Sequence, residues 1–193
     1  MGCTTSILDP YNAVDPQISD TEILGVKLDL MSVCNVLNNV DMSLKLPPYT
    51  YHEILISVSY RLLRRYPLSE FPSEASNDVA IHLGSLTLLS TVLFQSGQSL
   101  RISYKLLAVR VRSLIENSLT KREIDDTMLL WLVLLSGISI LNPNKSWLRP
   151  HFKDCLSALK IDSWESARHE IQSLPWIDTI HNKAGQNLWS ELA

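Results

Sequence analysis

Apolar residues recur at helical spacing along most of this sequence. From Ser19 onward they fall three and four positions apart, which places their side chains on one face of a helix. No segment alternates apolar and polar residues over the length of a strand. Nor does a unit of fixed period repeat, as a solenoid requires. The pattern therefore predicts an all-α fold, an irregular bundle or array of about eight helices.

Helix start and stop signals divide the chain. Several periods open with a capping box, such as Ser19-x-x-Glu22, and end at Pro, Gly or Asn. Residues 1–17 contain two Asp-Pro pairs, which disfavour helix, so we expect a flexible leader there and a helical domain over 18–193. The predicted helices run from Ser19 to before Pro47, Thr50 to Pro67, Glu74 to Phe94, Ser99 to about Leu119, Thr120 to the Asn142-Pro143-Asn144 break, about Ser146 to Lys160, Asp162 to Pro175, and Pro175 to near the C-terminus.

Composition indicates a folded protein. Of the 193 residues, 46% are hydrophobic and 19% are charged, which argues against intrinsic disorder. A net charge of -3 gives no global field that attracts nucleic acid. The longest apolar run, Met128 to Leu135, is too short to span a bilayer, so we expect a helix in the middle of the bundle.

The cysteines carry no metal or redox motif. Cys3, Cys34 and Cys155 lie far apart in sequence with no C-x-x-C pair, which favours a reducing compartment. His151 and Cys155 are four residues apart and would share one face of a helix, as a nucleophile and its base would need. With no third orienting group in the pattern, we favour a buried cysteine beside a surface histidine.

Other polar residues have structural explanations that we prefer. Asp125-Asp126 suits the positive N-terminal end of the fifth predicted helix. His52 and His82 have no visible partner for proton transfer. No phosphate-binding loop or nucleophile elbow is present, so we predict no enzyme, with no catalytic, cofactor-binding or metal-binding residues.

Two groups of basic residues could form nucleic-acid or phosphate sites. Both fall on predicted helices, where solvated helix ends or faces explain them better. They are Arg61, Arg64 and Arg65 with Tyr60 and Tyr66, and Arg101, Lys105, Arg110 and Arg112.

The N-terminus carries a lipidation pattern. Met1-Gly2-Cys3-Thr4-Thr5-Ser6 fits the myristoylation motif at Gly2, and Cys3 could take a palmitoyl chain as a second anchor. An ordinary disordered start is the alternative reading, because no polybasic patch adjoins the motif. Gly2 and Cys3 are therefore the candidate lipidation residues, and we expect membrane association only if they are acylated.

The last third of the chain holds all five tryptophans. We expect them to be core anchors at helix junctions, since large aromatic side chains dominate burial there. They are Trp131, Trp147, Trp164, Trp176 and Trp189.

Five sequence segments, four of them around tryptophans, resemble a known family. Val79 to Gln95, Leu129 to Gly137, Lys145 to Leu148, Leu174 to Asp178 and Ala184 to Trp189 occur in the order and spacing of the C-terminal regulatory domain of fungal zinc-cluster transcription factors. The resemblance covers residues 20–193 and implies an all-helical regulatory domain in the nucleus. Family members carry six cysteines that hold two zinc ions and read DNA, and three scattered cysteines cannot build that cluster.

The resemblance implies a transcriptional regulator of a metabolic or secondary-metabolite gene set. We expect it to act through protein partners, either the transcription machinery or a zinc-cluster factor, or through a small-molecule effector, and not through direct reading of DNA sequence. Two alternatives stay open. One is an N-terminally acylated adaptor in the cytoplasm or at a membrane, and the other is a truncated gene product without a role of its own.

Overall fold

Two helices are buried on every side and occupy the centre of the molecule. The computed structural model describes residues 16–39, 48–70, 72, 74–92, 104–141 and 145–193. Its central helices are α3 (Asn77–Val92) and α5 (Asp126–Ile138). All side chains from Met128 to Gly137 are buried, as the all-round apolar sequence of α5 predicts. The burial of α3 from Val79 to Leu89 was not predicted, because its sequence was interpreted as a helix with one apolar stripe.

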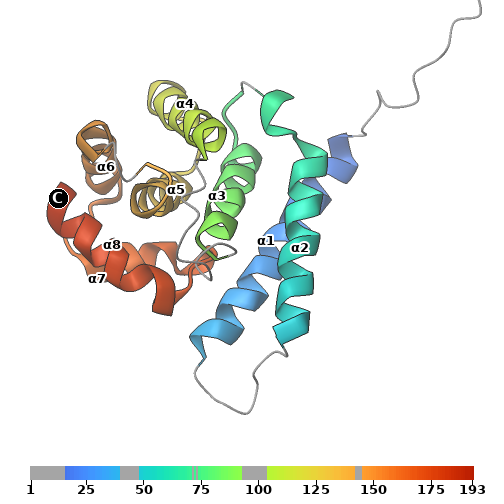
Figure 1. Ribbon diagram of the computed structural model, residues 1–193. Helices are drawn as coiled ribbons and strands as arrows, with labels where there is room; N and C mark the ends of the chain where they lie inside the picture. The colour runs from blue at the N-terminus through green and yellow to red at the C-terminus, as the bar shows by residue number, and fades with distance from the viewer. Residues whose placement is uncertain (1–15, 40–47, 71, 73, 93–103, 142–144) are drawn as a thin grey trace, which may run out of the picture.

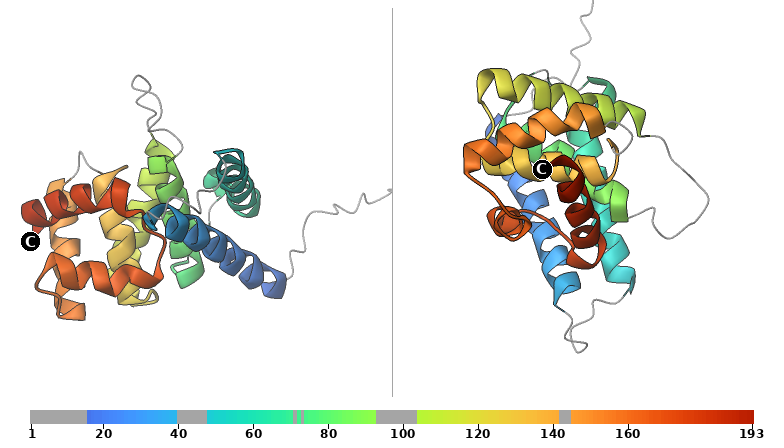
Figure 2. Two further views of the ribbon diagram at one scale, coloured as in Figure 1. Left: turned by 90° about the horizontal axis from the view of Figure 1, so that it is seen from below. Right: turned by 90° about the vertical axis from the view of Figure 1, so that its left-hand side faces the viewer.

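The remaining helices surround this pair. α1 and α2 lie side by side at one end of the molecule next to α3, and α1 also contacts α8 (Figure 1). Figure 2 shows α4, α6 and α8 around α5 in its right-hand view. The described part of the chain contains eight α-helices and no strand, which confirms the predicted all-α fold. The surrounding elements are α1 (Pro16–Asn38), α2 (Pro48–Arg65), α4 (Lys105–Lys121), α6 (Lys145–Leu159), α7 (Trp164–Glu170) and α8 (Asp178–Leu192), with 3₁₀ turns η2 (Leu68–Glu70) and η4 (Ile171–Ser173).

A glycine lets the two central helices approach closely. A Cβ atom placed on Gly84 of α3 would lie 2.1 Å from the ring of Trp131 on α5. The Trp131 ring is fully buried, and its Nε1–H donates to the carbonyl oxygen of Pro175 at 2.8 Å. Trp164 and Trp176 are also buried, whereas Trp147 and Trp189 are partly buried. The predicted role as core anchors therefore holds fully for three of the tryptophans.

Two helices begin at a proline rather than at the predicted capping box. α1 begins at Pro16 and α2 at Pro48, upstream of the expected starts at Ser19 and Thr50. Proline suits the first turn because its φ angle is already helical and its missing N–H has no partner there in any case. The last two residues of the predicted leader 1–17 thus belong to α1, and residues 1–15 lie outside the described residues.

The start of α5 also differs from the prediction. The predicted box from Thr120 to Glu123 is wrong because α4 continues to Lys121. Asp125 caps α5 instead, since its Oδ1 accepts the backbone N–H groups of Thr127 at 3.0 Å and Met128 at 3.4 Å.

Three further starts also differ from the sequence prediction by a few residues. The N-cap of α7 is Ser163, whose Oγ accepts the N–H of Ser166 at 3.2 Å. The observed starts are Asn77 in place of Glu74 for α3, Trp164 in place of Asp162 for α7, and Asp178 in place of Pro175 for α8. α4 begins at Lys105, and its predicted start at Ser99 lies outside the described residues.

Candidate functional site

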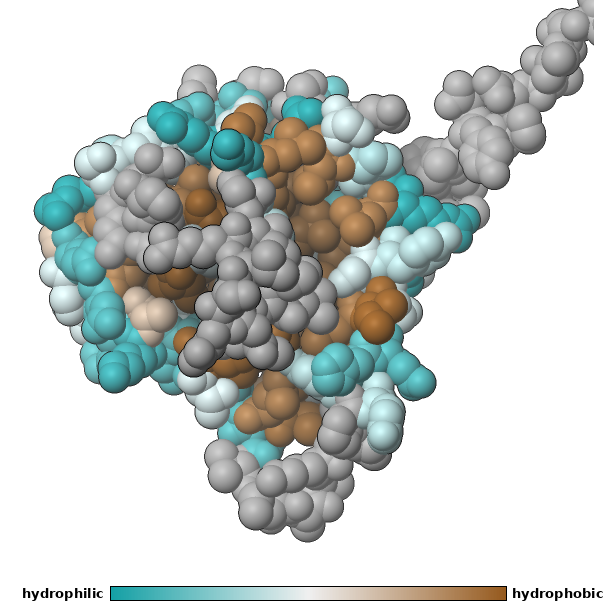
Figure 3. Space-filling model, viewed as in Figure 1, coloured by the Kyte–Doolittle hydropathy of each residue, from teal (hydrophilic) through white to brown (hydrophobic). Residues whose placement is uncertain are grey.

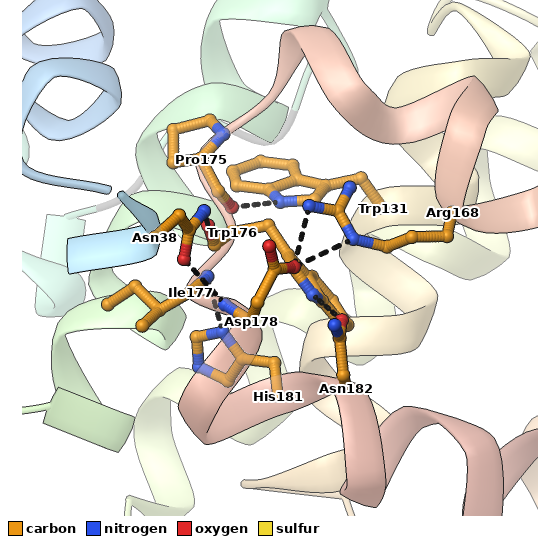
Figure 4. Close-up of polar contacts among 9 residues, drawn as sticks. All are labelled: Asn38, Trp131, Arg168, Pro175, Trp176, Ile177, Asp178, His181 and Asn182. Carbon is orange, nitrogen blue, oxygen red and sulfur yellow. Dashed lines mark hydrogen bonds and ion pairs between the residues drawn. The ribbon is translucent and has the colours of Figure 1, made fainter. Parts of the chain in front are cut away.

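A buried polar junction joins α1 to the segment before α8 (Figure 4). The side-chain amide of Asn38, the last residue of α1, donates to the carbonyl oxygen of Trp176 at 2.8 Å and accepts the N–H of Asp178 at 2.8 Å. Asp178 Oδ1 also accepts from Arg168 at 3.0 and 3.3 Å, and this guanidinium lies 5.4 Å from the centroid of the Trp176 ring. Because Pro175 to Ile177 are held in this way, α8 begins only at Asp178.

His181 completes the junction as a neutral imidazole. Its Nδ1 accepts the backbone N–H of Ile177 at 3.0 Å, and its Nε2 lies 2.8 Å from Thr91 Oγ1. An accepting Nδ1 assigns the proton to Nε2, which then donates to Thr91. Burial, and then the nearby Arg168 charge, lowers the pKa of His181 to about 4. Each residue drawn in Figure 4 makes at least one hydrogen bond within the protein, which favours a structural connection over a reactive site.

The predicted pair His151 and Cys155 shares α6, but it is not arranged as a catalytic pair. Cys155 is buried, and its burial raises the pKa of the thiol to about 12, which disfavours the thiolate. His151 is partly buried against the ring of Trp147, with ring centroids 4.4 Å apart. Desolvation lowers the pKa of His151. The buried thiol expected for Cys155 is confirmed, whereas the expected surface histidine is partly buried.

A cavity of about 330 Å³ lies beside Cys155 where α4, α5 and α6 meet. Its lining includes Arg122, Asp126, Asp154 and Ser118. The Ser118 hydroxyl donates to the carbonyl oxygen of Leu114 at 2.6 Å and is therefore already satisfied. Ligand pockets are mostly apolar with a few polar groups, and this cavity, with three charged side chains in its lining, lacks that character.

The other titratable candidates lie apart from one another. His52 is exposed on α2, and its ring is 5.5 Å from that of Tyr51. His82 is fully buried in α3, and burial lowers its pKa to about 3. Asp125 and Asp126 stand at the start of α5, as predicted. Within the described ranges, no three His, Cys, Asp or Glu side chains gather closely enough to hold a metal ion.

The basic residues of α4 form contacts within the protein. Arg110 donates to the carbonyl oxygens of Leu68 and Ser69, both at 3.0 Å, and so ties η2 to α4. Arg112 pairs with Glu116 at 3.2 Å and lies 4.5 Å from the centroid of the Trp147 ring. Arg101 lies outside the described residues, and Lys105 is exposed. The continuous solvated face expected from the sequence is therefore interrupted.

The predicted basic group on α2 is divided in the same way. Arg61 is ion-paired with Asp29 of α1, and Arg65 lies 3.8 Å from Asp78 of α3. Arg64 is exposed near the C-terminal end of α2. Two of the three arginines thus hold helices together rather than forming a phosphate-binding patch.

The outer face of α2 is a candidate contact surface that the sequence analysis did not identify. It exposes four large apolar side chains, and hydrophobic surface is visible over this helix in Figure 3. The sequence does contain a signal for this face, because two tyrosines, an isoleucine and a leucine are spaced to share one side of a helix. These four residues, called here the α2 stripe, are Tyr49, Ile56, Tyr60 and Leu63, with exposed fractions of 81, 63, 65 and 48%.

The candidate lipidation residues Gly2 and Cys3 lie outside the described residues. No helix in the described part of the chain has the length and apolar character needed to cross a membrane.

Comparison with known proteins gives no relative from which to transfer a function. No protein-family model, no curated protein and no solved structure matches the chain.

Proposed function

We propose that this protein is a transcriptional regulator that acts through contacts with other proteins. The observation that carries the proposal is the α2 stripe, a line of exposed apolar side chains on a helix at one edge of the molecule. Two segments, Leu174–Asp178 and Ala184–Trp189, are among those that resemble fungal transcription-factor domains. This resemblance is the basis for proposing transcription as the process and the nucleus as the location.

The composition of the stripe favours a protein partner. Tyrosine is enriched in protein interfaces and at their energetic centres because it offers a large, rigid contact area. Exposed apolar side chains that stand singly are common, whereas a contiguous patch marks an interaction site. The stripe combines Tyr49 and Tyr60 with two aliphatic residues on one helix, so a partner that covers the helix removes all four from water together.

The described charges favour a role without direct reading of DNA bases. Base and phosphate contacts require arginine and lysine side chains that are free to reach the duplex. Arg61, Arg110 and Arg112 are already engaged within the protein. The net charge of -3 adds no attraction for nucleic acid.

Transcript profiling tests the proposal. A strain that lacks the gene is complemented with wild type, with Ile56→Glu, or with Val109→Glu. Val109 is a matched control because it is a β-branched residue on α4 with 61% exposure, close to the 63% of Ile56. We expect the deletion to change a defined gene set and wild type and Val109→Glu to restore it, whereas Ile56→Glu does not.

Localisation of a C-terminally tagged protein completes the test. A nuclear signal is expected for wild type and both variants. Unchanged transcripts after deletion would contradict the proposal, and so would restoration by Ile56→Glu. A membrane signal that is lost in Gly2→Ala would instead favour the acylated adaptor.

A further inference from the structure

α2 carries two separate apolar faces, and only one of them is covered. Leu55, Val58 and Leu62 are buried against the rest of the molecule. At about 100° per residue, the four residues of the α2 stripe fall within an arc of about 60° whose centre is turned roughly 140° from that inward face. The stripe is about 20 Å long, from Tyr49 to Leu63, at about 1.5 Å of rise per residue. A second apolar face of this width and length fits another helix.

Two opposite charges flank the stripe on the same edge. Glu53 and Arg64 are both exposed, and in the described part of the chain neither has an ion-pair partner. On the helix they lie roughly 50° and 70° from the centre of the stripe, on the same side. They are separated by about 16 Å along the axis, and their midpoint falls between Ile56 and Tyr60. The charges are therefore symmetric about a point between Ile56 and Tyr60, about 4 Å along the axis from the middle of the stripe.

We propose that the α2 stripe binds the same stripe of a second copy of this chain, with the two α2 helices antiparallel. A twofold axis that relates two antiparallel helices and runs across their interface keeps each edge of one helix beside the same edge of the other. With the axis between Ile56 and Tyr60, Glu53 of one copy lies beside Arg64 of the other copy, and the pair occurs twice. Ile56 then packs against Tyr60 of the other copy at the centre.

The charge pattern selects this arrangement over a parallel one. A twofold axis along the helices exchanges the two edges, so Glu53 and Arg64 would lie on opposite sides of a parallel interface. Isologous contacts of this kind are the commonest form of protein oligomer because each copy supplies both halves of a self-complementary surface. The α2 stripe is self-complementary in its flanking charges and in its central apolar pair, Ile56 and Tyr60, whereas Tyr49 lies opposite the segment that follows α2 in the other copy.

The proposed dimer should be reversible. Two tyrosines of about 150–250 Å² each, with one isoleucine and one leucine, fit the smaller specific interfaces, below about 1,200 Å² in total.

The inference rests on the proposed function in one respect, since it takes the α2 stripe as the protein-contact surface and identifies the partner as a second copy.

Sedimentation velocity of the full chain over a wide range of protein concentration tests the dimer. We expect wild type and Val109→Glu to dimerise with the same Kd, and Ile56→Glu to raise the Kd at least about thirtyfold, as loss of a central contact does. Ile56 is 63% exposed, so its variant should keep the helical circular dichroism and melting temperature of wild type. A wild type that stays monomeric at every concentration overturns the proposal, and so does a dimer that Ile56→Glu leaves intact.

Charge reversal tests the antiparallel geometry. Glu53→Arg and Arg64→Glu should each weaken self-association roughly tenfold, because each turns two attractive pairs into two repulsive pairs. The double variant restores both pairs and should dimerise like wild type. A mixture of the two single variants should form heterodimers, since all four opposed charges then attract. Single variants that associate like wild type, or a mixture that forms no heterodimer, contradict the antiparallel pairing.

The failures of the two proposals can be told apart. A monomeric wild type whose Ile56→Glu variant still loses gene control leaves the regulatory function standing with a different partner on the α2 stripe. A wild-type dimer that Ile56→Glu dissociates, with no change in any transcript, leaves the dimer standing and contradicts the function.

Discussion

His181 lies between two partners that accommodate only one proton on its ring. Its Nδ1 must accept from Ile177, so protonation there would set two N–H groups against each other. Thr91 cannot compensate by donating to Nε2, because its hydroxyl already donates to the carbonyl oxygen of Leu88 at 2.6 Å. This residue could not be identified from sequence as part of a junction. Its partner Thr91 lies on α3, and nothing in the local pattern around Thr91 indicates that the two helices meet.

The buried histidines predict a loss of stability in acid. The pKa of His181 is about 4 in the folded protein, below its ordinary value of 6.5, and that of His82 is about 3. Because the unfolded chain binds these protons more readily, their contribution to stability is complete above about pH 6.5 and is lost as the pH falls, towards 4 for His181 and towards 3 for His82. His181 alone should account for up to about 3 kcal/mol over this window.

Urea unfolding at a series of pH values measures the effect. We expect His181→Asn to flatten the decline in the free energy of unfolding between pH 6.5 and 4. His169→Asn is the control, since His169 is exposed on α7, and it should keep the wild-type slope. An identical slope in all three proteins would show that His181 is not held neutral by the fold.

At the scale of elements, the helices were predictable and several of their ends were not. The spacing of three and four defines α2 and α6 because an amphipathic helix has to bury one face, and the pattern shows that face directly. α8 differs because its start depends on Asn38, which is far away in sequence and holds Trp176 and Asp178 from outside the helix. A local capping rule has no access to such a contact.

Asn38 predicts how firmly α1 is attached to the rest of the molecule. Asn38→Ala removes both hydrogen bonds to the segment before α8, and it leaves the N–H of Asp178 and the carbonyl oxygen of Trp176 without these partners. We expect a loss of about 1–3 kcal/mol in the free energy of unfolding, together with faster amide hydrogen exchange in α1.

Asn35→Ala provides the comparison. Asn35 lies one turn earlier on α1 and is exposed, so its replacement should leave stability and exchange at or slightly above wild-type values. Equal effects of the two substitutions would mean that the junction in Figure 4 does not secure α1.

At the scale of the whole molecule, the proposed contact surface follows from a packed interior and an apolar face of α2 that the other described helices leave exposed. The buried thiols of Cys34 and Cys155, both with a pKa raised to about 12, belong to the interior. α2 lies at the opposite end of the molecule from α6 and exposes its stripe to solvent. The sequence could predict the all-α fold from its periodicity and the anchoring tryptophans from their size. It did not single out the exposed face of α2, because which of two apolar faces is covered depends on how the helices assemble.

Photo-crosslinking in cells tests the contact surface most directly. A benzophenone amino acid is placed at Tyr60 in the α2 stripe or, as the control, at Val109 on α4, both of which are exposed. After irradiation of nuclei we expect covalent adducts from the Tyr60 position, including one with the mass of two chains, and none from the Val109 position. Adducts from Val109 alone, or no adduct from Tyr60, would contradict the assignment of the α2 stripe as the surface through which this protein acts.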